Sequence, residues 1–333
     1  MKKLLSFTLV LLFVFAPAAS VYAADINVTA RAAIVMDFET GEILFQRDIH
    51  TPRVPASMTK AMTAFVVYEE IERGNLTMDT LITISANASR IASDANMQGA
   101  PFPLAAGSRH TVDTLLHLSM LPSSNGANVA LAEHIAGSEA AFAQRMNESA
   151  AAIGMYSRFT NSHGALPHYT TAYSLALLTR EFIKRHPDIL RITGAATMDF
   201  QGRTVNNTNL LHSTWAYAGA DGFRTGTTRE AGFCLIATAY RDGRRIITVV
   251  MNAPDNPGRY GDTHRLLDFG FAESARRAAE RINVTINGVP VLFDVPPQTV
   301  GGRVMVPVRT IAEALGKQVF WNPATNTVEI LDR

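Results

Sequence analysis

Ser57 and Lys60, a serine and a lysine three positions apart, are the residues of this chain whose types and spacing most directly suggest chemistry. They lie between a proline-containing segment, residues 51–55, and the apolar run 61–68, where a helix is expected to begin. Residues at i and i+3 share a helix face, so the amine of Lys60 can reach the hydroxyl of Ser57. Free N–H groups at the helix N-terminus add positive potential. The pair could therefore form an activated serine nucleophile that needs no histidine.

Two further motifs follow in the chain. Ser123 and Asn125 lie on a short break between residues 112–121 and 127–135, both of which are typical of helices. Arg224-Thr225-Gly226-Thr227 precedes the apolar run 231–239, which is typical of a buried strand, so a cation and a hydroxyl are expected on an edge strand. A Ser-x-x-Lys motif alone is weak, because about one chance match is expected in a chain of this size. The three motifs together, in this order, are a strong signal.

This order is typical of β-lactamases and penicillin-binding proteins. The intervening segments 121–128, 160–164 and 242–245 agree with it, and over roughly residues 30–279 the chain resembles the serine D-alanyl-D-alanine carboxypeptidases, the low-molecular-mass penicillin-binding proteins. The resemblance implies an α+β fold, with a β-lactamase/transpeptidase-like antiparallel sheet and an inserted helical region. It also implies removal of the terminal D-alanine from peptidoglycan stem pentapeptides, covalent inhibition by β-lactam antibiotics, and a role in cell-wall biogenesis and cell shape.

The resemblance assigns a role to each motif. It implies that Ser57 is the acylated nucleophile and Lys60 its base, while Ser123 and Asn125 relay protons and hold the substrate amide. His163, with the glycine that follows it, is assigned a packing or turn role and no part in catalysis.

The same resemblance places the substrate-binding residues on the opposite wall of the site. These are Arg224, Thr225, Gly226 and Thr227. The backbone N–H groups of Ser57 and Thr227 are expected to form the oxyanion hole.

Arg224 departs from the family pattern, which usually has lysine at this position. Arginine is not expected to transfer protons in turnover, so Arg224 must act as a fixed charge. A guanidinium can bind the terminal carboxylate of a peptide through two parallel hydrogen bonds. A second cation near Lys60 should also lower the pKa of that amine and make its neutral form more accessible.

Two alternative functions compete with the carboxypeptidase. A serine β-lactamase with this motif set uses a glutamate for deacylation, and nothing here matches the Glu-x-x-Leu-Asn segment associated with that enzyme. A non-catalytic penicillin-binding paralogue is suggested by Arg224. Each motif alone also has a purely structural interpretation, since Ser57 could be a helix N-cap and Ser123 an ordinary turn residue.

The N-terminus is typical of an exported protein. Lys2 and Lys3 precede the apolar run 4–16, and Val21-Tyr22-Ala23 offers a cleavage site, so residues 1–24 are predicted to be a signal peptide.

A net charge of +1 gives no electrostatic case for nucleic-acid binding. The nine histidines lack a paired metal-ligand spacing, so neither a metal nor another cofactor is expected. Cys234 is the only cysteine and is predicted to pack as a small apolar side chain.

Two domains are predicted to follow the signal peptide. The catalytic domain should span residues 25–281 and the second domain residues 282–333. In the first, the expected strands are 32–37, 43–45 and 246–251, and the expected helices are 59–73, 140–153, 172–185 and 264–281.

The second domain should be β-rich. It contains an Asn-Gly hairpin signal within residues 284–291, a short helix at 310–315, and a second hairpin at 319–330. This block resembles the copper amine oxidase N-terminal-like domain. It implies no copper, because it contains no His or Cys. A spacer or wall-polymer contact is the hypothesis for its role.

Overall fold

A computed structural model describes residues 26–94, 102–164 and 168–332 of the chain. The predicted signal peptide lies outside these ranges. Within them, no helix has both the length and the apolar character needed to cross a membrane.

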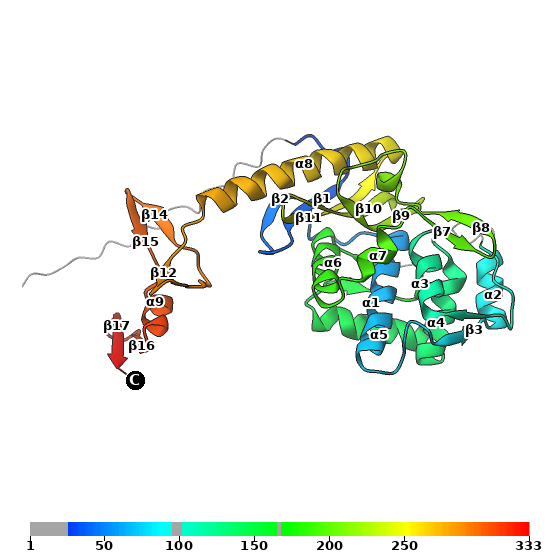
Figure 1. Cartoon of the computed structure of the whole chain (residues 1–333), viewed down its shortest axis with the longest axis horizontal. Coiled ribbons are helices and arrows are strands. Elements are labelled where there is room, and N and C mark those ends of the chain that lie inside the picture. The colour runs from blue at the N-terminus through cyan, green and yellow to red at the C-terminus, as the bar shows by residue number, and fades with distance from the viewer. Residues whose placement is uncertain (1–25, 95–101, 165–167, 333) are drawn as a thin grey trace, which may run out of the picture.

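A five-stranded antiparallel sheet forms the centre of the first domain (Figure 1). Its strand order is β2-β1-β11-β10-β9, so strands from both ends of the domain sequence pair with each other. The strands are β1 (Ala32–Asp37), β2 (Ile43–Arg47), β9 (Ala220–Thr228), β10 (Gly232–Arg241) and β11 (Arg244–Ala253). β9 is an edge strand, as the sequence predicts. The predicted α+β class and its antiparallel sheet are confirmed.

The chain between β2 and β9 supplies the inserted helices. They are α1 (Thr59–Glu72), α2 (Ala86–Ser93), α3 (Val112–Met120), α4 (Asn125–Ala136), α5 (Glu139–Ala152), α6 (Ala172–Arg185) and α7 (Ile189–Thr193). Three two-stranded sheets accompany them: β3 (Leu81–Thr83) with β4 (Arg109–Thr111), β5 (Ser157–Arg158) with β6 (Tyr169–Thr170), and β7 (Thr197–Phe200) with β8 (Arg203–Asn206).

The sheet separates two apolar cores because successive strand residues point to opposite faces. Ile34 and Met36 of β1 pack into the core shared with α1 and α6. Ala33 and Val35 pack into the core covered by α8 (Asn256–Glu280). α1 lies inside the helical region, since 12 of its 14 residues are buried. Its position explains why an apolar run, without amphipathic alternation, marks this helix in the sequence.

α8 begins eight residues earlier than the sequence predicted. The segment that precedes the predicted start contains Pro257, Gly258 and Gly261, but proline is well tolerated in the first helical turn. The side chain of Asp255 caps the helix by accepting a hydrogen bond from the backbone N–H of Gly258. Local start signals therefore overcome the low helix propensity of glycine.

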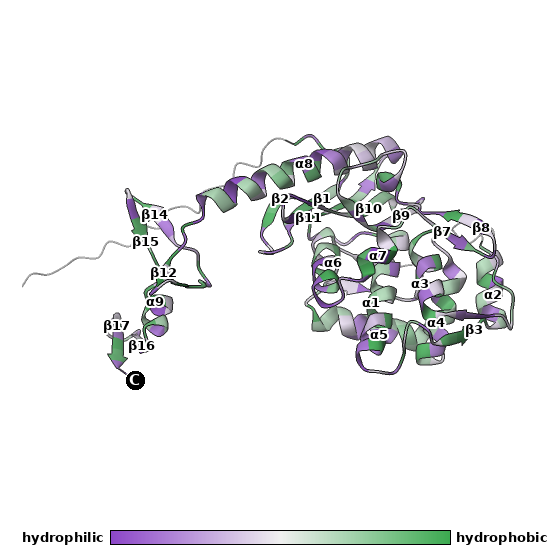
Figure 2. Cartoon of the chain, viewed as in Figure 1, coloured by the Kyte–Doolittle hydropathy of each residue, from purple (hydrophilic) through white to green (hydrophobic). Residues whose placement is uncertain are grey.

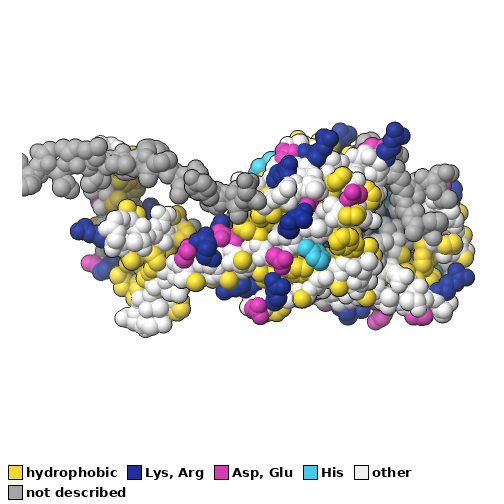
Figure 3. All heavy atoms as spheres, turned by 90° about the horizontal axis from the view of Figure 1, so that it is seen from above, with side chains coloured by type: hydrophobic (Ala, Val, Ile, Leu, Met, Phe, Trp, Pro, Cys, Tyr) yellow, Lys and Arg dark blue, Asp and Glu magenta, His cyan; other side chains and the backbone are white. Residues whose placement is uncertain are grey.

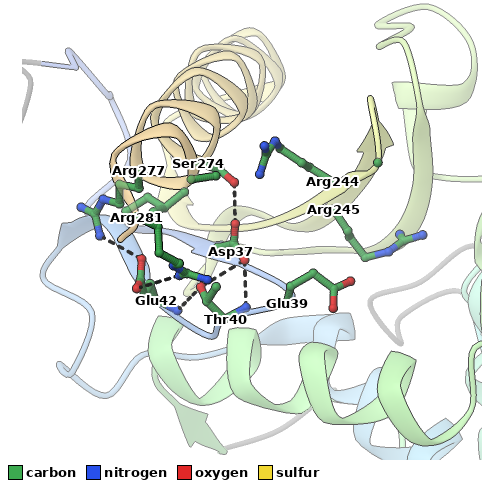
Figure 4. A pocket seen from close by; sticks show the side chains of 12 residues that line it. Asp37, Glu39, Thr40, Glu42, Arg244, Arg245, Ser274, Arg277 and Arg281 are labelled. Carbon is green, nitrogen blue, oxygen red and sulfur yellow. Dashed lines mark hydrogen bonds and ion pairs between the residues drawn. The ribbon is translucent and has the colours of Figure 1, made fainter. Parts of the chain in front are cut away.

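The turn between β1 and β2 is tied to the end of α8 (Figure 4). The hydroxyl of Ser274 donates to Asp37, and Glu42 lies 3.5 Å from Arg277 and 3.4 Å from Arg281. These side chains line a cavity of about 120 Å³ that includes none of the predicted site residues. The cavity therefore belongs to the packing of α8 on the sheet.

The C-terminal segment contains three hairpins and one short helix. The hairpins are β12 (Thr285–Ile286) with β13 (Val289–Pro290), β14 (Gln298–Val300) with β15 (Arg303–Met305), and β16 (Lys317–Asn322) with β17 (Thr327–Asp332). The helix is α9 (Val308–Ala314). The hairpin β14–β15 was not predicted. Its turn residues, Gly301 and Gly302, both have positive φ.

Asp262 of α8 anchors the chain that leads into β1, and this gives a test of the fold. Its fully buried carboxylate accepts hydrogen bonds from the backbone N–H groups of Thr29 and Ala30. Asp262→Ala should lower the free energy of unfolding by about 3 kcal/mol, because buried donors lose a charged acceptor. Urea denaturation measures the change. The matched control Asp268→Ala, on the exposed face of the same helix, should lower it by less than about 1 kcal/mol, and equal losses would contradict the anchoring role.

Candidate active site

Ser57 lies in a single turn of 3₁₀ helix, Ala56–Met58, immediately before α1. The residue before it, Ala56, has a φ of 49°, which is uncommon for a residue other than glycine. Lys60 is in the first turn of α1, and its Nζ lies 2.9 Å from the Oγ of Ser57. The spacing of three residues therefore brings hydroxyl and amine together as expected.

The amine of Lys60 is fully buried and has only neutral hydrogen-bond partners among the described residues. Its Nζ lies 2.8 Å from the Oδ1 of Asn125 and 2.8 Å from the backbone carbonyl oxygen of His163. Burial without a counter-ion lowers the pKa of Lys60 well below its ordinary value, and the charge of Arg224 lowers it further. The effect of Arg224 was expected from the sequence, but burial is the larger cause.

These contacts suit a neutral amine. A neutral Lys60 has two N–H donors for the oxygens of Asn125 and His163, and its lone pair is left to accept the hydroxyl proton of Ser57. This is the hydrogen-bond pattern that a general base requires.

Ser123 and Asn125 reach the site from the break between α3 and α4. Ser123 has a φ of 73°, and its hydroxyl donates to the Oγ of Ser57 at 3.2 Å. Ser124 caps α4 by accepting from the N–H of Ala127, which fixes Asn125 as the first residue of that helix. Both predicted polar groups therefore lie next to the Ser57 and Lys60 pair.

The segment 161–164 contributes more than the packing role that the sequence suggested. The carbonyl of His163 accepts from Lys60, and Gly164 has a φ of 92°. A Cβ at Gly164 would lie 2.1 Å from the carbonyl oxygen of Ala56, so only glycine allows this approach to the Ser57 turn. The contact to Lys60 is made by the backbone, and such contacts leave no side-chain signal in a sequence.

The edge strand β9 forms the facing wall of the site. A Cβ at Gly226 would lie 2.6 Å from the carbonyl oxygen of Pro55, so glycine lets β9 lie directly against the Ser57 turn. The hydroxyl of Thr225 is 2.9 Å from that of Thr208. Strand alternation places Thr225 and Thr227 on one face of β9 and Arg224 on the other.

Arg224 is almost fully buried beneath this wall. Its Nη1 donates to the carbonyl of Met120 and to the hydroxyl of Thr208, each at 3.0 Å. Its Nε and Nη2 have no hydrogen-bond partner among the described residues. Burial and the nearby charge of Arg259 lower the pKa of Arg224 to about 9, so the guanidinium stays charged at neutral pH.

Arg259 is a site residue that sequence reasoning missed. It lies in the first turn of α8, and its Nη1 donates to the hydroxyl of Thr227 at 3.1 Å and to the carbonyl of Cys234 at 3.2 Å. Its side chain is buried over the ring of Tyr260. A single arginine in a polar helical segment belongs to no motif, so no sequence pattern marks Arg259 as a site residue. The predicted apolar packing of Cys234 is confirmed by its burial.

Known proteins match both parts of the chain. A family model described as D-alanyl-D-alanine carboxypeptidase matches residues 18–255, and one described as copper amine oxidase N-terminal domain matches residues 279–332. The second segment contains no His or Cys, so its residues do not provide the usual copper ligands. Among the described residues, no group of three His, Cys, Asp or Glu side chains could hold a metal ion.

Individual relatives agree with the first family model. The chain is 32% identical to the D-alanyl-D-alanine carboxypeptidase DacF of Bacillus subtilis, over 87% of this chain and 76% of that protein. It is 34% identical to DacD of Escherichia coli, over 73% of this chain and 63% of the relative, slightly less than two thirds of its length.

Solved structures share the fold. The D-alanyl-D-alanine carboxypeptidase DacD of Francisella tularensis matches with a TM-score of 0.67 and 28% identity, over 92% of this chain and 87% of that one. The ampicillin-bound penicillin-binding protein D2 of Listeria monocytogenes matches with a TM-score of 0.65 and 30% identity, over 74% and 99% respectively. The family resemblance inferred from the motifs is thereby confirmed, and the chain belongs to the serine D-alanyl-D-alanine carboxypeptidases.

Proposed function

We propose that this chain removes the terminal D-alanine from peptidoglycan stem pentapeptides through an acyl-enzyme on Ser57. The observation that carries the proposal is the buried Lys60 amine, 2.9 Å from the Ser57 hydroxyl and without a counter-ion among the described residues. An amine in this setting can be neutral near neutral pH and can take the hydroxyl proton. The membership of the chain in the carboxypeptidase family supports the same reaction.

The reaction proceeds in two steps. In the first, the Oγ of Ser57 attacks the carbonyl carbon of the D-Ala–D-Ala bond while Lys60 accepts its proton. The terminal D-alanine leaves with a proton passed through the Ser123 hydroxyl, which lies 3.2 Å from the Ser57 Oγ. In the second step, water attacks the Ser57 ester and releases the shortened peptide. Asn125 holds the substrate amide while it orients the Lys60 amine.

The tetrahedral intermediate requires donors for its oxyanion. The backbone N–H groups of Ser57 and Thr227 are the proposed donors, and the close approach of β9 to the Ser57 turn at Gly226 supports this pairing. The Ser57 turn and β9, which are distant in the sequence, would then supply one donor each. The distance in space between these two N–H groups is therefore critical.

Recognition of the terminal carboxylate is assigned to two buried arginines, Arg224 of β9 and Arg259 of α8. The Nε and Nη2 of Arg224 are buried N–H donors without a hydrogen-bond partner in the described ranges, and Arg259 lies close enough to lower the pKa of Arg224. Two buried cations without an acidic hydrogen-bond partner among the described residues favour a bound anion. The hydroxyls of Thr225 and Thr227 provide neutral donors on the other face of the strand.

β-Lactam antibiotics are proposed to acylate the same serine. The Listeria relative in its ampicillin-bound form supports this for the family. A stable penicillin adduct distinguishes a carboxypeptidase from a β-lactamase, which must release the adduct quickly.

The export of the protein, its place at the cell wall and its effect on cell shape are part of the same proposal. Residues 1–24 act as the signal peptide and residues 25–281 as the catalytic domain. The mature enzyme would be exported to the compartment that contains peptidoglycan. Removal of the terminal D-alanine there would limit the number of pentapeptides available for crosslinking.

Contact of residues 282–333 with wall polymer is a separate proposal. The exposed ring of Phe320, among polar neighbours on β16 and β17, is the feature that supports it. Purified peptidoglycan should retain the full chain and should retain a truncation that ends at Arg281 less well. Equal retention of the two proteins would remove this role.

Fluorescent penicillin and a muramyl pentapeptide test the proposed reaction. Wild-type protein should carry a stable label and release free D-alanine from the pentapeptide. Ser57→Ala should lose both activities, because it lacks the nucleophile. Rapid release of the label would indicate a β-lactamase, and absence of labelling would indicate a silent paralogue.

Arg224 should control selectivity for a free terminal carboxylate. Arg224→Lys keeps the charge and should leave activity within about tenfold of wild type, whereas Arg224→Ala should weaken the use of free-acid peptides. Steady-state rates with a free-acid peptide and its C-terminal amide measure the effect. The amide is the control. Equal turnover of acid and amide by the wild type would rule out carboxylate recognition.

Gly226 should control the distance between the two oxyanion donors. Gly226→Ala introduces a Cβ 2.6 Å from the Pro55 carbonyl, so β9 must move away from Ser57. Acylation by penicillin should slow by about 100-fold. Gly261→Ala in α8 is the matched control, because its Cβ would meet nothing closer than 3.5 Å. A Gly226→Ala protein that acylates at the wild-type rate would contradict the proposed wall.

A further inference from the structure

Thr208 lies outside the three motifs and contacts two residues of the β9 wall. It follows β8 in a short loop, and its Oγ1 is 3.0 Å from the Nη1 of Arg224 and 2.9 Å from the Oγ1 of Thr225. Strand alternation directs the side chains of Arg224 and Thr225 to opposite faces of β9. The hydroxyl of Thr208 therefore connects two side chains that the strand itself directs apart.

The positive charge of the site is deeply buried. Arg224 is 1% exposed and Arg259 is 5% exposed. On the face of the molecule seen in Figure 3, by contrast, Lys and Arg side chains are scattered among acidic ones. Because Arg224 is so deeply buried, a polar group nearer the surface of the site can present its charge to a substrate carboxylate. Thr208 is only partly buried and is bonded to Arg224.

The chemistry of the three groups fixes which of them donate. A guanidinium carries only donors, so the Oγ1 of Thr208 accepts from Arg224. An oxygen that accepts from a cation is a poorer acceptor for a second bond, and its own O–H is a better donor. Thr208 therefore donates its single proton to Thr225. The O–H of Thr225 is then left, among the described residues, for an acceptor that belongs to a ligand.

The backbone of Thr208 is fixed on two sides. Its N–H donates to the carbonyl of Leu121, two residues before Ser123, at 3.0 Å. Its carbonyl accepts from the hydroxyl of Tyr260 at 3.2 Å. α8 combines hydrophobic and hydrophilic residues along its length (Figure 2), and Tyr260 has both characters, because its ring stacks on Trp215 while its hydroxyl bonds to the loop. Thr208 therefore has a defined position between the α3–α4 break and α8.

Two buried asparagines hold the loop on either side of Thr208. The Nδ2 of Asn207 donates to the carbonyl of Thr193 at the end of α7. The Nδ2 of Asn209 donates to the carbonyl of Gly222 in β9. A hydroxyl supported in this way keeps one orientation relative to β9, as a preorganised binding contact requires.

We propose that Thr208 is a positioning residue for the terminal carboxylate of the substrate. It accepts a hydrogen bond from Arg224 and donates one to Thr225, so that the O–H of Thr225 is directed at the carboxylate. The charge of Arg224 polarises both hydroxyls and strengthens the bond to the carboxylate. This role of Thr208 rests on the proposed function, because it requires a substrate with a free terminal carboxylate.

Removal of the Thr208 hydroxyl tests the proposal. Thr208→Val keeps the branched shape of the side chain without the hydroxyl, and Thr208→Ser keeps the hydroxyl. Steady-state kinetics compare a peptide that ends in free D-alanine with its C-terminal amide. In Thr208→Val, kcat/KM for the acid should fall by about tenfold, mainly through KM, because a bond to a charged group is lost. The value for the amide should be unchanged, and Thr208→Ser should match the wild type.

Thr204→Val is the matched control for the loss of a threonine hydroxyl. Thr204 is exposed on β8, four residues before Thr208. Its replacement should leave kcat/KM for both peptides at the wild-type values.

A double-variant cycle tests whether the two hydroxyls form one chain. Thr225→Val alone should also lower kcat/KM for the acid by about tenfold. Thr208→Val/Thr225→Val should then lose no more than Thr225→Val alone, because Thr208 acts through Thr225. A combined loss of about 100-fold would indicate independent contributions and would contradict the chain.

The outcomes distinguish the role of Thr208 from the proposed function. A wild-type protein that releases no D-alanine would contradict the proposed function, and the role of Thr208 with it. A wild type that prefers the acid, with the same preference in Thr208→Val, would overturn the role of Thr208 alone. Equal losses for acid and amide in Thr208→Val would also overturn it, because they would indicate a purely structural effect.

Discussion

The site depends on one constraint, the burial of the Lys60 amine without a counter-ion. Each unit by which its pKa lies below the ordinary value represents about 1.4 kcal/mol of free energy that opposes the charged form. The unfolded chain would bind this proton at neutral pH, so the neutral amine lowers stability there, and stability should rise with pH toward the ordinary lysine pKa. The proposed reaction requires a neutral amine, because a charged Lys60 could not take a proton from Ser57. The neutral oxygens of Asn125 and His163 orient the amine without restoring its charge.

The rest of the domain holds four separate segments around that amine. The 3₁₀ turn presents Ser57, the α3–α4 break presents Ser123, the segment at Gly164 presents a carbonyl, and β9 closes the site. Close approach is possible because Gly164 and Gly226 have no side chain where they meet the backbone of Ala56 and Pro55. The sheet, with α8 on one face and the inserted helices on the other, gives the rigid support that such contacts require.

The elements that the sequence predicted correctly are those marked by side-chain patterns or by a helix stop. α1 ends within one residue of the predicted position, because Gly74 is a helix stop with positive φ. The burial of β10 followed from its apolar run, and the edge position of β9 from the polar motif that precedes that run. The start of α8 was missed because Pro257 and two glycines masked a capped helix. Arg259 and the His163 carbonyl were missed because a lone arginine and a backbone contact belong to no motif.

The pH dependence of Ser57 acylation by penicillin tests the central claim most directly. The second-order rate constant should rise with pH as Lys60 loses its proton and should level off above an apparent pKa well below the ordinary lysine value of 10.5. Below that pKa the amine is charged and acylation should fall. A rate constant that keeps rising to an apparent pKa near 10.5 would show an ordinary, solvated lysine and would contradict the account.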